Sequence, residues 1–149
     1  MRWFWKRTGM ALAMASGLAL AAAGVAEAHS YKLGSIEIGH LWSPPPKPGI
    51  DGLAVYGPIL NEGAKMQHLM GASSPLAAKV RFREGKESWP RSIDLAPRKP
   101  VSLASWGTHI WLSGLKKPVK VGDWVELTLD FGTVGKLKVK SLVETSPGD

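Results

Sequence analysis

The clearest pattern in the chain is a strict alternation of apolar and polar residues near its C-terminal end. In "WVELTLDF", residues 124–131, every second residue from Val125 to Phe131 is apolar, and "KLKVKSLV", residues 136–143, repeats the alternation. A period of two residues is typical of a strand with one face in the core. The short connection "GTVG" contains two glycines. The two runs therefore predict a β-hairpin.

Four earlier runs predict further strands, because they are short and rich in apolar, β-branched or aromatic residues. They are "YKLGSIEIGHLW", "LAVYGPIL", "KVRFRE" and "HIWLSGL". The prolines of "SPPPKPGIDG" cannot donate to a ladder, which predicts an extended connection between the first two runs. No stretch has the period of an amphipathic helix, and "MGASSPLAAKV" predicts one helical turn at most. The sequence therefore predicts an all-β antiparallel sandwich or barrel.

The first 28 residues have the pattern of a secretory signal peptide. A basic start precedes the apolar run "ALAMASGLALAAAGV", which is too short to span a bilayer comfortably, and Ala26-Glu27-Ala28 forms an A-x-A cleavage pattern. Cleavage after Ala28 would make His29 the first residue of a single domain over residues 29–149. We therefore expect an exported, periplasmic protein without stable membrane insertion after cleavage.

Composition narrows the chemistry of this domain. The formal net charge is +7, but the basic residues are scattered or alternate along strands, which indicates solvated faces rather than a nucleic-acid surface. The chain has no cysteine, which excludes disulfides, thiol nucleophiles and thiolate metal sites. No nucleophile elbow, phosphate loop, HExxH or paired acid motif appears, so the sequence predicts no enzyme. Soft-metal chemistry in this chain therefore depends on His and Met side chains.

Three stretches carry a resemblance to a known family. They are "IEIGHLWSPPP", then "LNEG" followed by "LMGASSPLAAKV", and finally "THIWLSGLKKPVKVGDWVELTLDFGTVGKLKVKSLV". Together they resemble the periplasmic copper chaperone family PCu(A)C, also written PCuAC. The resemblance implies a cupredoxin-like Greek-key β-sandwich that binds copper as Cu(I). It also implies a partner that accepts the copper, such as a subunit of cytochrome c oxidase.

The resemblance also allows the family's copper ligands to be compared with this chain. The family uses a His, a Met a short distance on, and a downstream His-x-Met pair. His109 matches the second histidine, but Trp111 stands where the last methionine is expected. Arg83 takes the place of the first histidine, and Trp89 is the bulky residue nearest to the intervening methionine. The resemblance therefore implies a degenerate site with one ligand of four, and with a positive charge where the cation would bind.

Other residues offer alternative ligands. Met66, His68 and Met70 in "MQHLM" would share one face of a strand, either as a soft-metal row or as core-filling methionines beside an edge histidine. A mature N-terminal His29 can chelate Cu(II) through its α-amine and ring, or can be a frayed terminus. His109 is either a metal ligand with new partners or a strand residue that packs beside a tryptophan.

Three functions stay open on this sequence. The first is a copper chaperone or copper-binding protein that uses His109 with some of the alternative ligands. The second is a metal-free interaction module, in which the arginine and tryptophans at the substituted positions form a binding patch. The third is a copper protein of the histidine-brace kind, with His29 as its first ligand.

Overall fold

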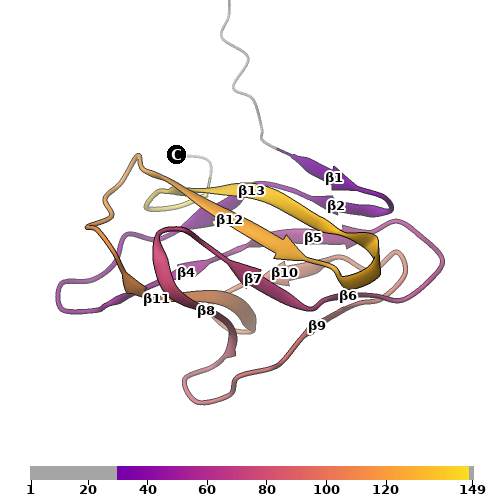
Figure 1. Ribbon diagram of the computed structural model, residues 1–149, viewed down its shortest axis with the longest axis horizontal. Helices are drawn as coiled ribbons and strands as arrows, with labels where there is room; N and C mark the ends of the chain where they lie inside the picture. The colour runs from indigo at the N-terminus through magenta and orange to yellow at the C-terminus, as the bar shows by residue number, and fades with distance from the viewer. Residues whose placement is uncertain (1–29, 148–149) are drawn as a thin grey trace, which may run out of the picture.

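The computed structural model describes residues 30–147, and nearly all regular structure in this part is β (Figure 1). The predicted signal peptide and His29 lie outside the described residues. One short 3-10 helix, η1 (Gly132–Val134), accompanies the strands. The all-β prediction is confirmed. The strands are β1 (Tyr31–Leu33), β2 (Ile36–Ile38), β3 (Leu41–Ser43), β4 (Gly52–Val55), β5 (Gly57–Asn61), β6 (Gln67–Leu69), β7 (Gly71–Ser73), β8 (Ala77–Glu84), β9 (Ile93–Leu95), β10 (Val101–Leu103), β11 (Thr108–Leu115), β12 (Trp124–Asp130) and β13 (Lys136–Val143).

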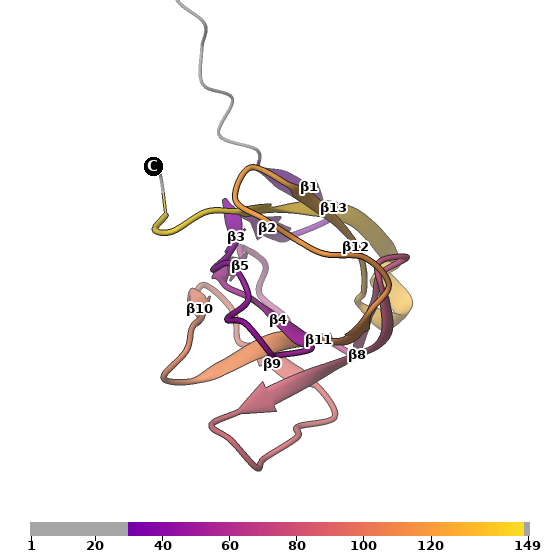
Figure 2. The same cartoon turned by 90° about the vertical axis from the view of Figure 1, so that its left-hand side faces the viewer.

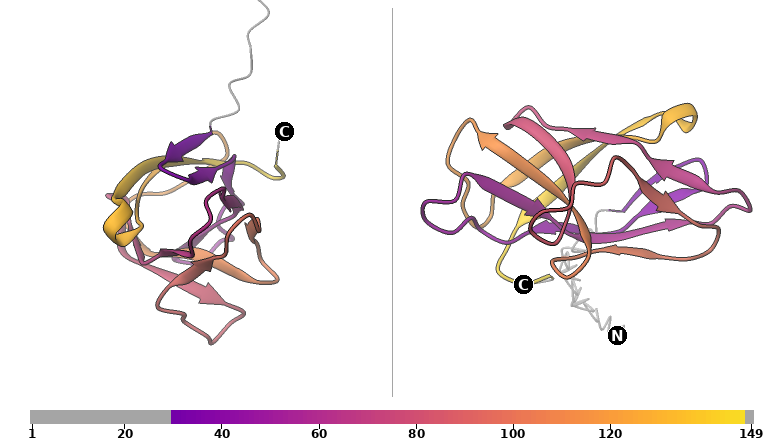
Figure 3. Two further views of the ribbon diagram at one scale, coloured as in Figure 1. Left: turned by 90° about the vertical axis from the view of Figure 1, so that its right-hand side faces the viewer. Right: turned by 90° about the horizontal axis from the view of Figure 1, so that it is seen from below.

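The strands form three larger sheets and one small ladder. Their orders are β1-β2-β5-β10, β4-β11-β8, β3-β13-β12-β7 and β6-β9. Figure 2 and the left view of Figure 3 show the sheets curving around a common interior, and the right view of Figure 3 shows that the arrangement is elongated. The pairings are antiparallel except that β3 lies parallel to β13. The described residues therefore form the predicted sandwich, closed toward a barrel.

The predicted C-terminal hairpin is present. β12 and β13 pair antiparallel along their lengths, from Trp124 opposite Leu142 to Asp130 opposite Lys136. The connection is η1, and the backbone N–H of Phe131 donates to the carbonyl oxygen of Gly135 at 2.9 Å. The alternation along the sequence therefore identified both strands and their joining turn.

Two of the predicted strands are divided by glycines. In the run over residues 31–42, Gly34 has a φ of +57°, and the chain reverses there so that β1 pairs with β2. In the run over residues 53–60, Gly57 has a φ of +144°, and a Cβ at this position would lie 2.5 Å from the carbonyl oxygen of His40. The prediction of one strand per run was wrong because apolar patterning does not report left-handed or closely packed backbone.

The segment over residues 70–80 contains no helical turn. Its first part forms β7, whose backbone pairs with β12, and its last part begins β8. The sheet ladders therefore take up the hydrogen-bonding groups that a helix would have used. β9 and β10 were not predicted, because strands of three residues are too short to show a period. The proline segment over residues 44–51 is a connection without strand structure, as predicted.

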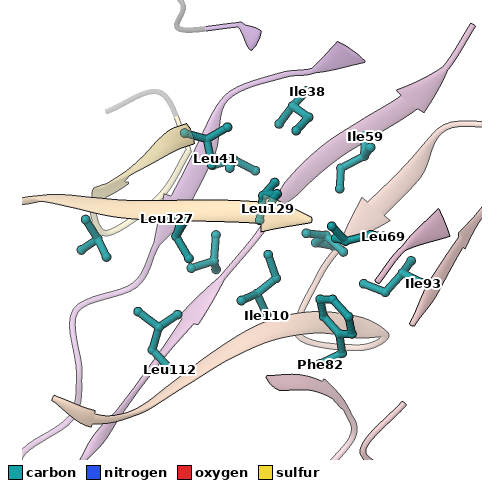
Figure 4. Close-up of a cluster of buried hydrophobic side chains, with 14 of the residues drawn as sticks. Ile38, Leu41, Ile59, Leu69, Phe82, Ile93, Ile110, Leu112, Leu127 and Leu129 are labelled. Carbon is teal, nitrogen blue, oxygen red and sulfur yellow. The ribbon is translucent and has the colours of Figure 1, made fainter. Parts of the chain in front are cut away.

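The core is one cluster of apolar side chains drawn from all the larger sheets (Figure 4). Ile110 and Leu112 of β11 meet Leu127 and Leu129 of β12, and each is at most 1% exposed. Burial of such side chains is the main stabilising contribution in a domain of this size. Because the inward residues of β11 belong to this core, its alternate residues are left on the outer face of the sheet.

Candidate functional site

The candidate site lies on the outer face of the β8–β11 pair. Arg83 is opposite His109 in the register of these strands, and Arg81 is opposite Trp111. Ile110 between them points into the core (Figure 4), so His109 and Trp111 share the other face. The ring centres of these two residues are 6.4 Å apart. The prediction that alternation places them on one face is confirmed.

Two arginines and two tryptophans on this face form a group that we call the arginine–tryptophan cluster: Arg81, Arg83, Trp89 and Trp111. Cζ of Arg81 lies 3.6 Å from the ring centre of Trp89. Cζ of Arg83 lies 5.4 Å from the ring centre of Trp89 and 4.6 Å from that of Trp111. At these distances the guanidinium groups are attracted by the faces of the indole rings. Three of the four positions compared with the family ligands therefore meet in the cluster, and His109 adjoins it.

Arg81 is a cluster member that sequence reasoning missed. The signal was present in "KVRFRE", because alternation along a strand puts Arg81 on the same face as Arg83. The pairing of β8 with β11 then brings Arg81 to Trp111. The stacking of Arg81 on Trp89 depends on the loop after β8, whose course the sequence pattern does not reveal.

The backbone of β4 fixes the position of Trp111. A Cβ atom built on Gly52 would lie 2.1 Å from Cζ2 of Trp111, so the indole lies directly over this glycine. Gly52 is itself buried and pairs with β11. A side chain at residue 52 is therefore incompatible with the observed position of the Trp111 indole. It would also prevent Trp111 from contacting Arg83 in the cluster.

His109 is 5% exposed and has protein partners on several sides. Its Nδ1 atom lies 3.2 Å from the carbonyl oxygen of Gly107, and its ring centre lies 5.5 Å from that of Tyr56. Burial lowers the pKa of His109 below its ordinary value of 6.5, and the positive charge of Arg83 acts in the same direction, whereas nearby backbone carbonyls oppose the shift. The net shift of the pKa favours the neutral imidazole at His109.

The residues at the compared ligand positions do not fit a copper ion. His109 offers one imidazole, but the indole N–H groups of Trp89 and Trp111 are donors only, and the guanidinium of Arg83 is a permanent cation. In the part of the chain that the structure describes, no group of three or more His, Cys, Asp or Glu side chains is arranged to hold a metal ion.

A second set of soft donors lies at β6, and we call Met66, His68 and Met70 the His–Met row. Met66 is 48% exposed and Met70 is 52% exposed, while Leu69 between His68 and Met70 is fully buried. The alternative that the methionines fill the core is therefore wrong, because both side chains are about half exposed, one on each side of β6. Nδ1 of His68 lies 2.8 Å from Oδ1 of Asp94 on β9.

The remaining described histidine, His40, belongs to a different arrangement. Its Nε2 atom lies 2.5 Å from Oε1 of Glu144, and Glu144 is only 4% exposed. This pair connects the segment after β2 with the residue that follows β13. Glu144 carried no signal in the sequence, because an isolated acidic residue after a strand is normally solvated.

Comparison with known proteins assigns the chain to a family. The model of a family described as "Putative lipoprotein LpqE-like" matches residues 36–143. The chain belongs to this LpqE-like family. A putative lipoprotein of Leifsonia xyli subsp. xyli is 29% identical over an alignment of 86 residues, and the match covers 52% of this chain and 52% of that protein. The chain thus matches about half the length of this curated relative. The lipoprotein descriptions indicate an exported protein.

Solved structures similar to this LpqE-like protein are PCuAC domains. The copper-bound PCuAC domain from PmoF2 is 29% identical, with a TM-score of 0.72 over 79% of this chain and 99% of that domain. The Cu(I)-bound protein DR1885 from Deinococcus radiodurans is 26% identical, with a TM-score of 0.63 over 85% of this chain and 87% of that protein. The apo PCuAC domain from PmoF1, 22% identical with a TM-score of 0.73 over 79% of this chain and 100% of that domain, shares the fold. The predicted resemblance is confirmed: the chain is a divergent PCuAC member with a cupredoxin-like β fold.

No helix in residues 30–147 of the LpqE-like protein is both long enough and apolar enough to cross a membrane.

Proposed function

We propose that this protein handles copper in the periplasm, carries it as Cu(I), and passes it to an acceptor protein such as a subunit of cytochrome c oxidase. In this proposal it is a carrier and not an enzyme. The observation that carries the proposal is the His–Met row, an exposed set of soft donors on a chain that resembles a copper-bound PCuAC domain. Thioethers and imidazoles are ligands that suit Cu(I).

The geometry of the row favours His68 as its anchor. Alternate residues of a strand lie about 7 Å apart on the same face, and the unbranched side chains of Met66 and Met70 can turn toward the imidazole between them. The contact between Nδ1 of His68 and Asp94 orients the ring and directs Nε2 toward a metal. We therefore propose Nε2 of His68 and the two thioethers as the ligand set.

The arginine–tryptophan cluster is the reason for placing copper at the row. Arg83 and Trp111 leave His109 without a soft partner, and a fixed positive charge repels a cation. That His109 ligates copper stays a prediction of the resemblance. The proposal that His29 forms a histidine brace stays a prediction as well, because His29 lies outside the described residues.

Titration of the mature protein with Cu(I) against a competing chelator tests the proposal. We expect one Cu(I) to bind, and we expect His68→Gln to weaken binding by about 10-fold or more, which corresponds to 1.4 kcal/mol. Met66→Leu combined with Met70→Leu should weaken it comparably, because leucine keeps the side-chain bulk and removes the sulfur. His109→Gln is the matched control and should change the affinity less than about 2-fold. Copper binding that depends on His109 and not on His68 contradicts the ligand set.

A metal-free interaction module is the second candidate function, and the arginine–tryptophan cluster favours it. Arginine and tryptophan are the residue types enriched among the dominant contacts of protein interfaces. If the mature protein binds neither Cu(I) nor Cu(II), this candidate replaces copper handling.

A further inference from the structure

The guanidinium groups of the arginine–tryptophan cluster carry positive charge without acidic partners. None of the ion pairs formed among residues 30–147 involves Arg81 or Arg83. The Nε atoms of both arginines are buried and have no hydrogen-bond partner in the described part of the chain. Arg83 donates from Nη2 to the carbonyl oxygen of Lys86 at 3.3 Å. Buried donors without acceptors are costly, and such atoms in native proteins call for a ligand, a water or an ion.

A small cavity adjoins Arg81. It has a volume of about 270 Å³ and lies between β7, β8 and the segment after Trp89. Arg81 and Arg91 line it together with Trp89, while Met70 and Ala72 contribute apolar surface. Within residues 30–147, no acidic side chain lines the cavity. Its walls therefore combine two fixed positive charges with apolar and aromatic surface, at a size suited to one side chain rather than to a folded domain.

We propose that this cavity binds the carboxylate side chain of an acidic segment in a partner polypeptide. The guanidinium groups of Arg81 and Arg91 donate hydrogen bonds to the carboxylate oxygens. Arginine suits this contact because its N–H donors form a planar fork that matches the two oxygens of a carboxylate. Trp89 and the apolar wall contact the methylene groups of the inserted side chain.

Charge complementarity decides the kind of partner. Without the predicted signal peptide, which holds three basic residues and one acidic residue, the formal net charge falls from +7 to +5. This charge attracts acidic surfaces at long range, and the two arginines would then fix the register of a bound segment. A glutamate side chain offers a carboxylate and an alkyl stem together, which matches the mixed lining of the cavity. A free oxyanion would use the arginines and leave the apolar wall without a contact.

Calorimetric titration of the copper-free protein with a blocked hexaglutamate peptide tests this inference. We expect saturable binding at about 0.15 M salt, a condition under which unspecific surface attraction is largely screened. Arg81→Gln and Arg91→Gln should each weaken binding by about 5-fold or more, since each removes a charge-assisted hydrogen bond. Arg91 is exposed, so its variant serves even if Arg81→Gln impairs folding. Lys47→Gln, which removes an exposed charge in the proline segment, should change the affinity less than about 2-fold.

Three results would overturn the inference. Absence of saturable hexaglutamate binding is the first. Equal weakening by Lys47→Gln and Arg91→Gln is the second, because it would show a diffuse charge effect. The third is binding of inorganic phosphate as tight as that of the peptide, which would assign the cavity to a free oxyanion. The titration uses no metal, so its failure leaves the copper proposal intact, and failure of the copper titration leaves this inference intact.

Discussion

The guanidinium carbon of Arg83 lies 4.6 Å from the ring centre of Trp111, and both residues occupy positions at which the PCuAC resemblance implies copper ligands. The resemblance implies that a cation of the protein itself takes the place of the metal, and that an aromatic face takes the place of a thioether. His109 is opposite Arg83 in the strand register, so its imidazole adjoins the arginine–tryptophan cluster. The comparison of ligands from sequence thus identified positions that lie together in space.

Restoring soft ligands at these positions should create copper affinity. We predict that Arg83→His combined with Trp111→Met binds Cu(I) about 100-fold more tightly than the wild-type cluster does, because two imidazoles and a thioether then face one point. The experiment is best done in a His68→Gln background, which removes the proposed row. Adding His109→Gln should abolish the gain. A double variant that folds but gains no affinity would show that the side chains do not converge.

Gly52 should be essential for the position of Trp111. Gly52→Ala forces a methyl group into the indole, and we expect a loss of unfolding free energy of about 1–3 kcal/mol, as is typical of overpacking. Gly71→Ala is the matched control, because a Cβ at Gly71 would meet no atom within 4 Å. It should change stability by less than about 0.5 kcal/mol. Urea unfolding of the two variants measures both values, and equal losses would contradict the close packing over Gly52.

His109 should make stability depend on pH in the acidic range. Burial and Arg83 lower the pKa of His109 in the folded protein, so below the unfolded pKa of 6.5 the unfolded state binds more protons. Its contribution is fully present above pH 6.5 and is lost as pH falls toward the lowered folded pKa. We expect wild-type protein to lose more unfolding free energy between pH 7.5 and pH 5 than His109→Gln loses. Parallel losses in the two proteins would contradict this assignment.

The stability of the folded protein should depend on the contact between His40 and the buried carboxylate of Glu144. His40→Ala leaves Glu144 without its contact, and we expect a loss of about 1–3 kcal/mol in unfolding free energy, the usual cost of an unsatisfied buried polar group. Glu144→Gln combined with His40→Ala should recover part of this loss, because a neutral amide is cheaper to bury than a charge. A double-mutant cycle from urea unfolding curves gives the coupling, and a coupling near zero would contradict the importance of the pair.

The sequence predicted those strands that show a clear pattern of apolar and polar residues. Alternation identified the β12–β13 hairpin, and short runs rich in apolar, β-branched or aromatic residues identified β8 and β11, because the inward residues of all four strands belong to one core. Backbone features carried no such signal. The reversal at Gly34 and the division at Gly57 depend on local conformation and close approach, and β9 and β10 are too short to show periodicity.

The candidate site could be predicted in part for related reasons. The shared face of His109 and Trp111 follows from strand geometry alone. The meeting of Arg83 with Trp89 depends on a loop, and the pairing of His40 with Glu144 joins residues 104 positions apart in the chain. Contacts of this kind are decided by tertiary packing. The exposed location of Met66 and Met70 was likewise open until the inward side of β6 was known.

The most direct test of the central claim is to observe which imidazole binds copper. Nitrogen NMR of the histidine side chains, recorded before and after addition of one equivalent of Cu(I), distinguishes His68 from His109 in the intact mature protein. The account predicts that the ring nitrogens of His68 shift while those of His109 keep the signals of a buried neutral imidazole. A shift of His109 with His68 unchanged would contradict it, and would return the copper to the position that Arg83 and Trp111 now occupy.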